Sequence, residues 1–132
     1  MSGTAGATPY RPSYTAQELM AVSASRLLED HRVVFAGVGL PLLASILAKR
    51  RHAPELTIVL EGGIIGPGIL PGRLPISTNE MRAAHQATML TPISEIFLLA
   101  QRGCFHYGFL GAAQIDMFGN INTSVIGPAG RP

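Results

Sequence analysis

One carboxylate, Glu61, stands directly after a short apolar run and directly before two glycines. The run, residues 56–60, is nearly continuous in apolar character and contains β-branched residues, which is typical of a strand covered on both faces in a parallel sheet. An acid at its last residue would lie at the carboxyl end of the strand, where open α/β sheets bind ligands. Gly62, Gly63 and Gly66 would let backbone or ligand approach closely. Most lone glutamates are solvated loop acids, but this setting favours a functional role for Glu61.

Two other small-residue stretches are candidates for a binding site. In the stretch 37–39, Val38 and Gly39 lie between a predicted strand and a predicted helix, so their backbone amides could face an anion or a developing oxyanion. A tight turn of this kind also uses glycine for packing alone, and the third glycine of a dinucleotide-binding loop is absent. After a later apolar stretch, Gly111, Ala112 and Gln114 place small residues and one side-chain amide together.

The residues that most often bind metals or act as nucleophiles are isolated. The four histidines, at positions 31, 52, 85 and 106, lie mostly beside predicted element ends and lack motif-spaced partners, so we expect surface or capping roles and no metal site. The single cysteine, Cys104, cannot form an internal disulfide, and we expect it to be packed as a small hydrophobic residue.

Caps, breakers and periodicity predict a βαβ unit over residues 32–61 within an α/β fold. The fold expected is an open, mostly parallel sheet with helices on both faces. Residues 1–13 are predicted to be a flexible leader, and residues 14–132 a single domain. The predicted elements are a helix of about four turns after a capping box at Thr15 and Glu18, strands 32–35 and 56–60, a helix from Pro41 to about Arg51, a long loop 66–79, a helix from 91–92 to Gly103, and strands 105–113 and 121–126.

The composition bounds the partners of this 132-residue chain. Only 14% of residues are charged and 47% are hydrophobic, which is little charge for a free-standing domain and predicts that a partner covers part of the surface. The net charge of +2 is spread along the chain, which excludes a nucleic-acid surface, and no apolar run is long enough for a membrane span. With one cysteine and no recognised targeting signal, a cytoplasmic location is expected.

Taken in order and spacing, these stretches resemble the β subunit of family I CoA-transferases, and most closely the β subunits of the glutaconate CoA-transferase group. The match extends from about Tyr14 to Gly127. It is carried by the stretches 37–41, 60–63, 101–103 and 108–116, followed by 118–122. Members of the family keep a nucleophilic glutamate in a Glu-Ser-Gly or Glu-Asn-Gly turn, and Glu61 occupies that place with Gly62 in the second position. Relatives continue past the position of Pro132, so the fold is expected to be incomplete at the C-terminus.

The resemblance implies that Glu61 is acylated by an acyl-CoA thioester and then carries CoA as a glutamyl thioester in a ping-pong exchange with a carboxylic acid. It further implies oxyanion donors at Val38 and Gly39, a pocket lined by Gly62, Gly63, Gly111 and Ala112, and Gln114 as a candidate amide. The CoA thioester would be a substrate, with no permanently bound cofactor, and the partner would be a CoA-transferase α subunit.

Two alternatives remain at the level of sequence. One is a lyase or hydrolase that acts on a CoA thioester with the same scaffold, against which the glutamate argues. The other is a non-catalytic structural subunit that completes the pocket of a partner, for which the low charge argues.

Overall fold

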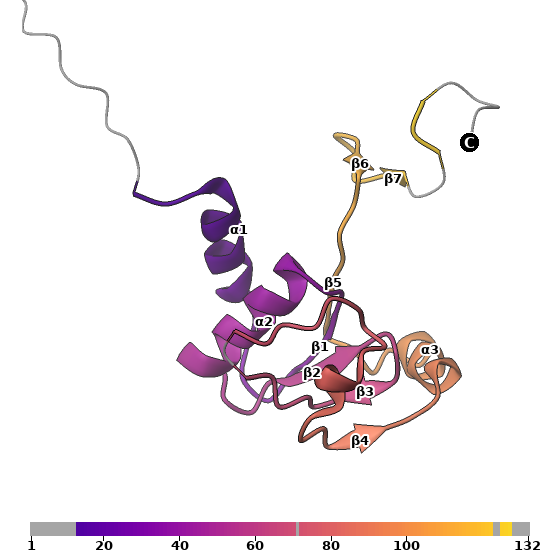
Figure 1. Ribbon diagram of the computed structural model, residues 1–132. Coiled ribbons are helices and arrows are strands. Elements are labelled where there is room, and N and C mark those ends of the chain that lie inside the picture. Colours follow the sequence, from indigo (N-terminus) through magenta and orange to yellow (C-terminus); the bar gives the residue numbers. More distant parts are fainter. Residues whose placement is uncertain (1–12, 71, 123–124, 128–132) are drawn as a thin grey trace, which may run out of the picture.

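The computed structural model describes residues 13–70, 72–122 and 125–127. They form a mixed α/β unit whose elements follow one another along the chain (Figure 1). In order these are α1 (Ala16–Ser25), β1 (Val33–Ala36), α2 (Leu40–Arg51), β2 (Thr57–Leu60), β3 (Ile64–Ile65), the 3-10 helix η1 (Met81–Ala84), β4 (Met89–Leu90), α3 (Ile93–Gln101), β5 (Tyr107–Phe109), β6 (Gln114–Ile115) and β7 (Ile121–Asn122).

The main sheet has the strand order β4-β3-β2-β1-β5. The three longest strands are parallel: β1 pairs with β2 so that Phe35 lies opposite Val59, and with β5 so that Ala36 lies opposite Phe109. The two short strands, β3 and β4, are antiparallel to their neighbours. The predicted α/β fold with a mostly parallel sheet is therefore confirmed, with an antiparallel edge added.

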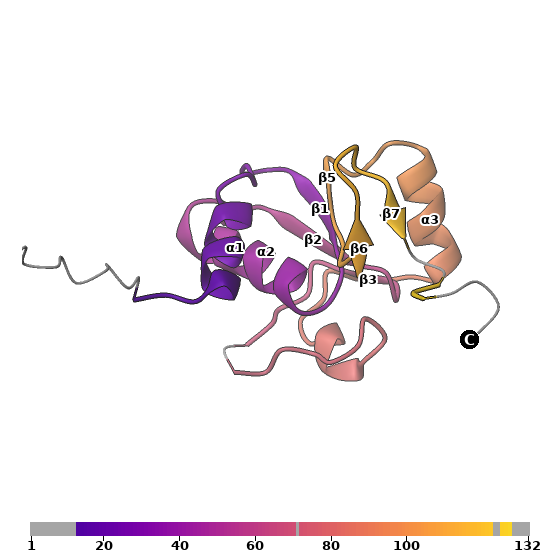
Figure 2. The ribbon, with the colours of Figure 1, turned by 90° about the horizontal axis from the view of Figure 1, so that it is seen from above.

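Helices cover both faces of this sheet. The crossover from β1 to β2 carries α2, and the crossover from β2 back to β5 carries α3 in the opposite direction along the sheet. Crossovers between parallel strands are right-handed as a rule, so two crossovers that run in opposite directions place their helices on opposite faces, and Figure 2 shows α2 and α3 on different sides of the sheet. Helix α1 packs on α2 as an outer layer. Leu42 from α2 and Val34, Leu56 and Leu60 from the strand region are fully buried in the core between α2 and the sheet.

The first helix begins as predicted and ends early. Thr15 and Glu18 form the capping box, in which the Thr15 N–H donates to the Glu18 carboxylate at 2.7 Å. The helix then ends at Ser25, short of the four turns expected. Its buried side is formed by Ala21, Ser25 and the following Leu28, whereas Met20 is 59% exposed.

The segment after β2 contains structure that the sequence did not reveal. Residues 64–65 lie among the glycines that follow Glu61, where no strand was predicted, yet they form β3, and residues 89–90 form β4 beside it. Residues 66–79 contain no helix or strand where the structure describes them, as predicted, and η1 follows. Two-residue strands have no periodic signal of their own, because only their hydrogen-bonded partners define them.

The C-terminal strands are shorter than predicted and belong to two sheets. Of the strand expected at 105–113, only β5 joins the main sheet, and of the strand expected at 121–126, only β7 forms among the described residues. It pairs antiparallel with β6 in a separate two-stranded sheet, the C-terminal hairpin (residues 110–122), which projects from the body in Figure 1. The strand expected at 121–126 is therefore shorter than predicted and lies outside the main sheet.

Two further expectations concern the leader and the absence of a membrane span. The leader predicted at residues 1–13 lies almost wholly outside the described residues. Among the helices that the structure describes, none has both the length and the apolar character needed to cross a membrane.

Candidate functional site

Glu61 lies in the turn that joins β2 to β3. Leu60 pairs with Ile64, so residues 61–63 form a three-residue connection, and the Gly63 N–H donates to the Leu60 carbonyl at 3.1 Å. The Glu61 side chain is exposed, and it forms no hydrogen bond or ion pair with the described part of the chain. Within that part, its carboxylate is therefore a free acceptor at the carboxyl end of a buried strand.

The two glycines after Glu61 are needed because other backbone lies against them. A Cβ atom at Gly62 would overlap the Thr78 carbonyl oxygen and the Asn79 Oδ1 atom, and one at Gly63 would overlap the Thr91 carbonyl oxygen. Gly63 also has φ +97°, a conformation that favours glycine. The Thr91 N–H donates to the Gly63 carbonyl at 2.8 Å. The turn that carries Glu61 is thus enclosed by backbone from both ends of residues 78–91.

The same close approach continues along the next residues. A Cβ at Gly66 would overlap Thr88 Oγ1, and one at Gly68 would press on the Gln86 side chain. Backbone bonds run alongside, from Thr88 N–H to the Ile65 carbonyl at 2.9 Å and from Gly68 N–H to the His85 carbonyl at 2.8 Å. Residues 78–92, which we call the arch, therefore leave the Glu61 turn at Gly62, pass Gly68 and return to the turn at Gly63.

Val38 and Gly39 lie at the same edge of the sheet as Glu61. They follow β1, whose carboxyl end lies between those of β2 and β5. The Gly37 N–H donates to the Phe109 carbonyl at 2.9 Å, and Gly39, with φ +79°, is the N-cap residue of α2. No side chain of the described residues caps this helix, and its first turn contains no acidic residue. The helix N-terminus therefore offers backbone donors to a bound anion.

The three residues predicted after β5 are divided between two places. Gly111 and Ala112 line a cavity of about 500 Å³ together with Met20 of α1 and Pro41 of α2. They therefore lie near the β1 loop. Gln114 instead belongs to β6, where its Oε1 atom accepts a hydrogen bond from Asn122 Nδ2 at 2.6 Å.

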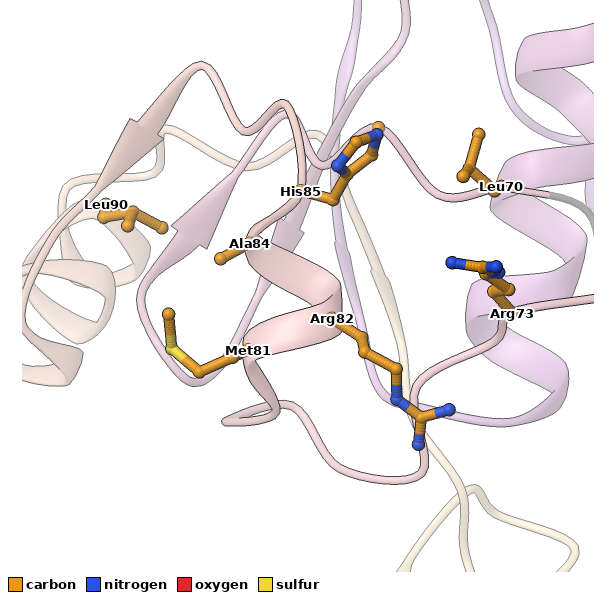
Figure 3. Close-up of a pocket in the computed structure, with 8 residues that line it drawn as sticks. Leu70, Arg73, Met81, Arg82, Ala84, His85 and Leu90 are labelled. Carbon is orange, nitrogen blue, oxygen red and sulfur yellow. The ribbon is translucent and has the colours of Figure 1, made fainter.

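A second cavity, of about 560 Å³, could not be anticipated from the sequence. It lies between the loop of residues 66–77 and the arch, and Figure 3 shows the residues around it. They are Gly68, Leu70, Arg73, Met81, Arg82, Ala84, His85 and Leu90. The signal available in the sequence was a long loop carrying one arginine, Arg73, with Arg82 a few residues after it, but only the arch brings Arg73 and Arg82 to one cavity.

The structure confirms the expected roles of two histidines and contradicts the expectation for the cysteine. His52 Nε2 lies 3.0 Å from the Leu28 carbonyl, and His106 Nδ1 accepts from the Val33 N–H at 3.1 Å, so these two rings satisfy backbone groups as expected. Cys104 is exposed, so the expectation of a packed side chain is wrong. Among the described residues, no three potential ligands of the His, Cys, Asp or Glu type gather to hold a metal ion.

Two carboxylates near these segments have perturbed acidity. Glu80, which opens η1, accepts from the Ile76 N–H at 2.8 Å and pairs with Arg82, and these contacts lower the pKa of the Glu80 carboxyl. Asp116, in the C-terminal hairpin, accepts from the Asn120 side chain at 2.7 Å and from backbone amides, which lowers the pKa of the Asp116 carboxyl. Both charges organise loops through local bonds.

Comparison with known proteins gives one family. Residues 17–132 match the model of the coenzyme A transferase family. By sequence, the chain is 42% identical over 121 residues to the B subunit of the 3-oxoadipate CoA-transferase of Pseudomonas knackmussii. It is 32% identical over 128 residues to the B subunit of the glutaconate CoA-transferase of Acidaminococcus fermentans. In both cases the match covers 91% of this chain and 46% of the relative.

Solved structures agree with the sequence comparison. The crystal structure of glutaconate CoA-transferase from Acidaminococcus fermentans superimposes with a TM-score of 0.77 at 31% identity, over 91% of this chain and 47% of that one. The decarboxylase AibA/AibB gives a TM-score of 0.76 at 30% identity, over 89% of this chain and 49% of the other. The chain thus spans about half the length of the relatives it matches.

Proposed function

Because this chain belongs to the coenzyme A transferase family, we propose that it works as the β subunit of an acyl-CoA:carboxylate CoA-transferase with Glu61 as the nucleophile. The family resemblance inferred from the motifs is confirmed by relatives that are B subunits of CoA-transferases. The nucleophile, the substrates and the partner are the parts of this proposal that experiment must test.

One observation carries the proposal, namely the setting of Glu61. A nucleophilic carboxylate must reach a carbonyl carbon without an internal partner that competes for its lone pairs, and it must be held still. Glu61 is exposed and lacks a hydrogen-bond partner in the described chain, while backbone of the arch fixes the turn on which it stands. A free side chain on a rigid turn suits repeated covalent bond formation.

The proposed reaction moves CoA between two carboxylic acids in balanced steps. A Glu61 oxygen attacks the thioester carbonyl of the donor, the C–S bond breaks, and an acyl-glutamyl anhydride forms with release of the CoA thiolate. The thiolate then attacks the glutamyl carbonyl, which gives a glutamyl-CoA thioester and frees the first acid. An acceptor carboxylate repeats the two steps in reverse order, so the acyl group is activated without ATP.

Each attack passes through a tetrahedral oxyanion that needs preorganised donors. The backbone N–H groups of Val38 and Gly39 are our candidates, since they lie at the same sheet edge as Glu61 and at a helix N-terminus that no described side chain caps. Gly111 and Ala112 would line the acyl side of the pocket. The amide oxygen of Gln114 accepts a hydrogen bond from Asn122 in the second sheet. We therefore propose that Gln114 contributes its amide to the pocket only if the hairpin rearranges or binds the partner subunit.

The family context also suggests the partners. We propose a CoA-transferase α subunit as the protein partner, a cytoplasmic location, and coenzyme A thioesters as substrates rather than a resident cofactor. The relatives named for 3-oxoadipate and glutaconate make these dicarboxylic acids the first acids to assay.

The alternatives are separated by acceptor dependence. A decarboxylase shares this fold at nearly the same TM-score, so the fold by itself does not select the reaction. A lyase or hydrolase would consume acyl-CoA with no acceptor acid, whereas the transferase requires one. A non-catalytic structural subunit would leave turnover unchanged when Glu61 is replaced.

The decisive experiment is trapping on Glu61 in the intact protein with its partner subunit. Incubation with acyl-CoA followed by borohydride or hydroxylamine, and then peptide mass spectrometry, should find the modification on Glu61. The variant Glu61→Gln should give neither the modification nor CoA exchange, while Glu55→Gln, an exposed acid at the opposite end of β2, serves as the matched control with full activity. An unmodified Glu61 in an active protein would refute the proposal.

A further inference from the structure

The cavity between the loop of residues 66–77 and the arch has two chemically different sides. Met81, Ala84 and Leu90 give it apolar surface, while Arg73 and Arg82 bring two guanidinium groups to it (Figure 3). A ligand matching this cavity would carry an anionic group next to an apolar or flat body. Its volume, about 560 Å³, is within the range of small-molecule sites.

Of the two arginines, Arg73 has no internal partner in the part of the chain that the structure describes. Its side chain makes no hydrogen bond or ion pair with those residues. Arg82 is bound through its Nε atom to Glu80, which is itself held by the Ile76 N–H. That pairing uses one donor of the guanidinium fork and leaves the others for a ligand. As far as the described residues go, the cavity therefore has one free cation and one cation oriented by a fixed carboxylate.

The cavity extends along the sheet away from the Glu61 turn: Leu90, on one side of it, is level with Ile64 and Leu60, whereas the Gly68 wall lies farther along. The Gly66 N–H donates to the Ile58 carbonyl at 2.8 Å, so β3 runs back along β2, and Gly68 lies beyond that level. At about 3.3 Å per residue, the Gly68 wall is roughly 10–15 Å from Glu61 along the strand direction. A short dicarboxylic acid held at Glu61 would end before this wall, whereas the extended pantetheine arm of CoA would reach it.

We propose that Arg73 and Arg82 bind the phosphate groups of the CoA thioester, with Met81 and Leu90 against its apolar portion. The inference rests on the proposed function, since it takes the thioester end of CoA to be at Glu61. Planar guanidinium groups bind phosphate oxygens through paired hydrogen bonds, and the exposed setting predicts that the interaction weakens with salt. The arch would then serve two tasks, holding the Glu61 turn and presenting a phosphate site.

The test is calorimetric titration of the intact protein with CoA, 3′-dephospho-CoA and pantetheine. Arg73→Ala and Arg82→Ala are each expected to raise the Kd for CoA about tenfold or more, the typical effect of losing a charged hydrogen bond. Pantetheine binding should not change in either variant. Arg26→Ala removes an equal charge from an exposed site that lines none of the cavities described and is the control. Because Arg82 also pairs with Glu80, Arg82→Lys is included to keep that ion pair.

The following outcomes decide between the phosphate site and its alternatives. An unchanged Kd for CoA in the Arg73→Ala variant overturns the phosphate site. A raised KM for the acceptor acid with an unchanged Kd for CoA also overturns it, because the cavity would then bind a substrate carboxylate. Trapping on Glu61 is scored separately in the same variant at saturating acyl-CoA. If Glu61 is trapped normally and the affinity for CoA is unchanged, the phosphate site is refuted and the proposed function stands. If the affinity for CoA falls but Glu61 is never modified, the proposed function is refuted and the phosphate site stands.

Discussion

The Glu61 turn with its arch and the C-terminal hairpin are both rich in glycine and apolar residues, yet they are held by different forces. In the first region, added Cβ atoms at Gly62, Gly63, Gly66 and Gly68 would overlap neighbouring atoms. In the second, apart from the glycine itself and its two chain neighbours, no atom of the described residues lies within 4 Å of the Cβ position at Gly111 or Gly119, and every described residue from 110 to 121 is exposed. Glycine thus marks close packing in one region and only backbone freedom in the other.

The largest effect should come from Gly63→Ala. The new Cβ would overlap the Thr91 carbonyl oxygen, and alanine is strained at φ +97°. We expect a loss of about 3 kcal/mol in the free energy of unfolding, measured by urea denaturation. Gly111→Ala is the matched control and should change stability by less than about 0.5 kcal/mol. Equal effects from the two substitutions would show that the regions do not differ in packing.

Next in size is the effect of Glu61→Asp on the rate. Since the turn is fixed by the arch, the backbone cannot follow the side chain when it is shortened by one methylene. The attacking oxygen then moves by about an ångström, which we expect to lower kcat on the order of a hundredfold, with unfolding unchanged. Steady-state exchange assays and a thermal melt measure the two quantities. Near-normal turnover by the aspartate variant would mean that the turn is mobile or that Glu61 is not the nucleophile.

A smaller and local effect is expected from Asp116→Ala. The Asp116 carboxylate accepts from the Phe118 and Asn120 N–H groups, both at 2.9 Å, and from the Asn120 side chain. Its loss should increase hydrogen exchange at those two amides while the melting temperature of the main sheet stays the same. A global fall in melting temperature would show that the hairpin is packed on the body and would remove the contrast between the regions.

The smallest expected effect is the pH dependence of the same hairpin. The bonds to Asp116 lower its pKa in the folded hairpin, so its contribution is present above the ordinary aspartate pKa and is lost as the pH falls through the lowered value. Amide shifts of Phe118 and Asn120, followed by NMR on acidification, should report this loss. The backbone bonds of Gly63 and Thr91 involve no titrating group, so their amides provide the control, and Asp116→Asn should abolish the transition.

The sequence predicts those features that are set by neighbours along the chain. The capping box at Thr15, the buried strand ending at Leu60 and the helix beginning at Pro41 all follow from local caps and periodicity, and all are present. Glu61 could be singled out because a charged residue that directly follows a buried strand must lie at the carboxyl end of that strand, where open α/β sheets bind ligands.

Features that depend on distant partners could not be predicted in the same way. β3 is defined by hydrogen bonds to β2 and β4, so residues 64–65 read as part of a turn. Arg73 and Arg82 reach one cavity only because the arch folds back along residues 62–68. The place of Gln114 depends in turn on its pairing with Asn122, a contact made by the turn between them rather than by any pattern at Gln114 itself.

The arch touches the Glu61 turn mainly through carbonyl oxygens and N–H groups, and this has an evolutionary consequence. Because these contacts, apart from the Asn79 side chain at Gly62, use atoms common to all residues, the other arch side chains can be exchanged by mutation without disturbing the turn, provided that the glycines stay. During evolution, substitutions at Met81, His85 and Leu90 could therefore change which ligands bind in the cavity beside the arch, while the proposed nucleophile stays in place. Among related chains, the glycines of the turn would then be retained while the arch side chains vary.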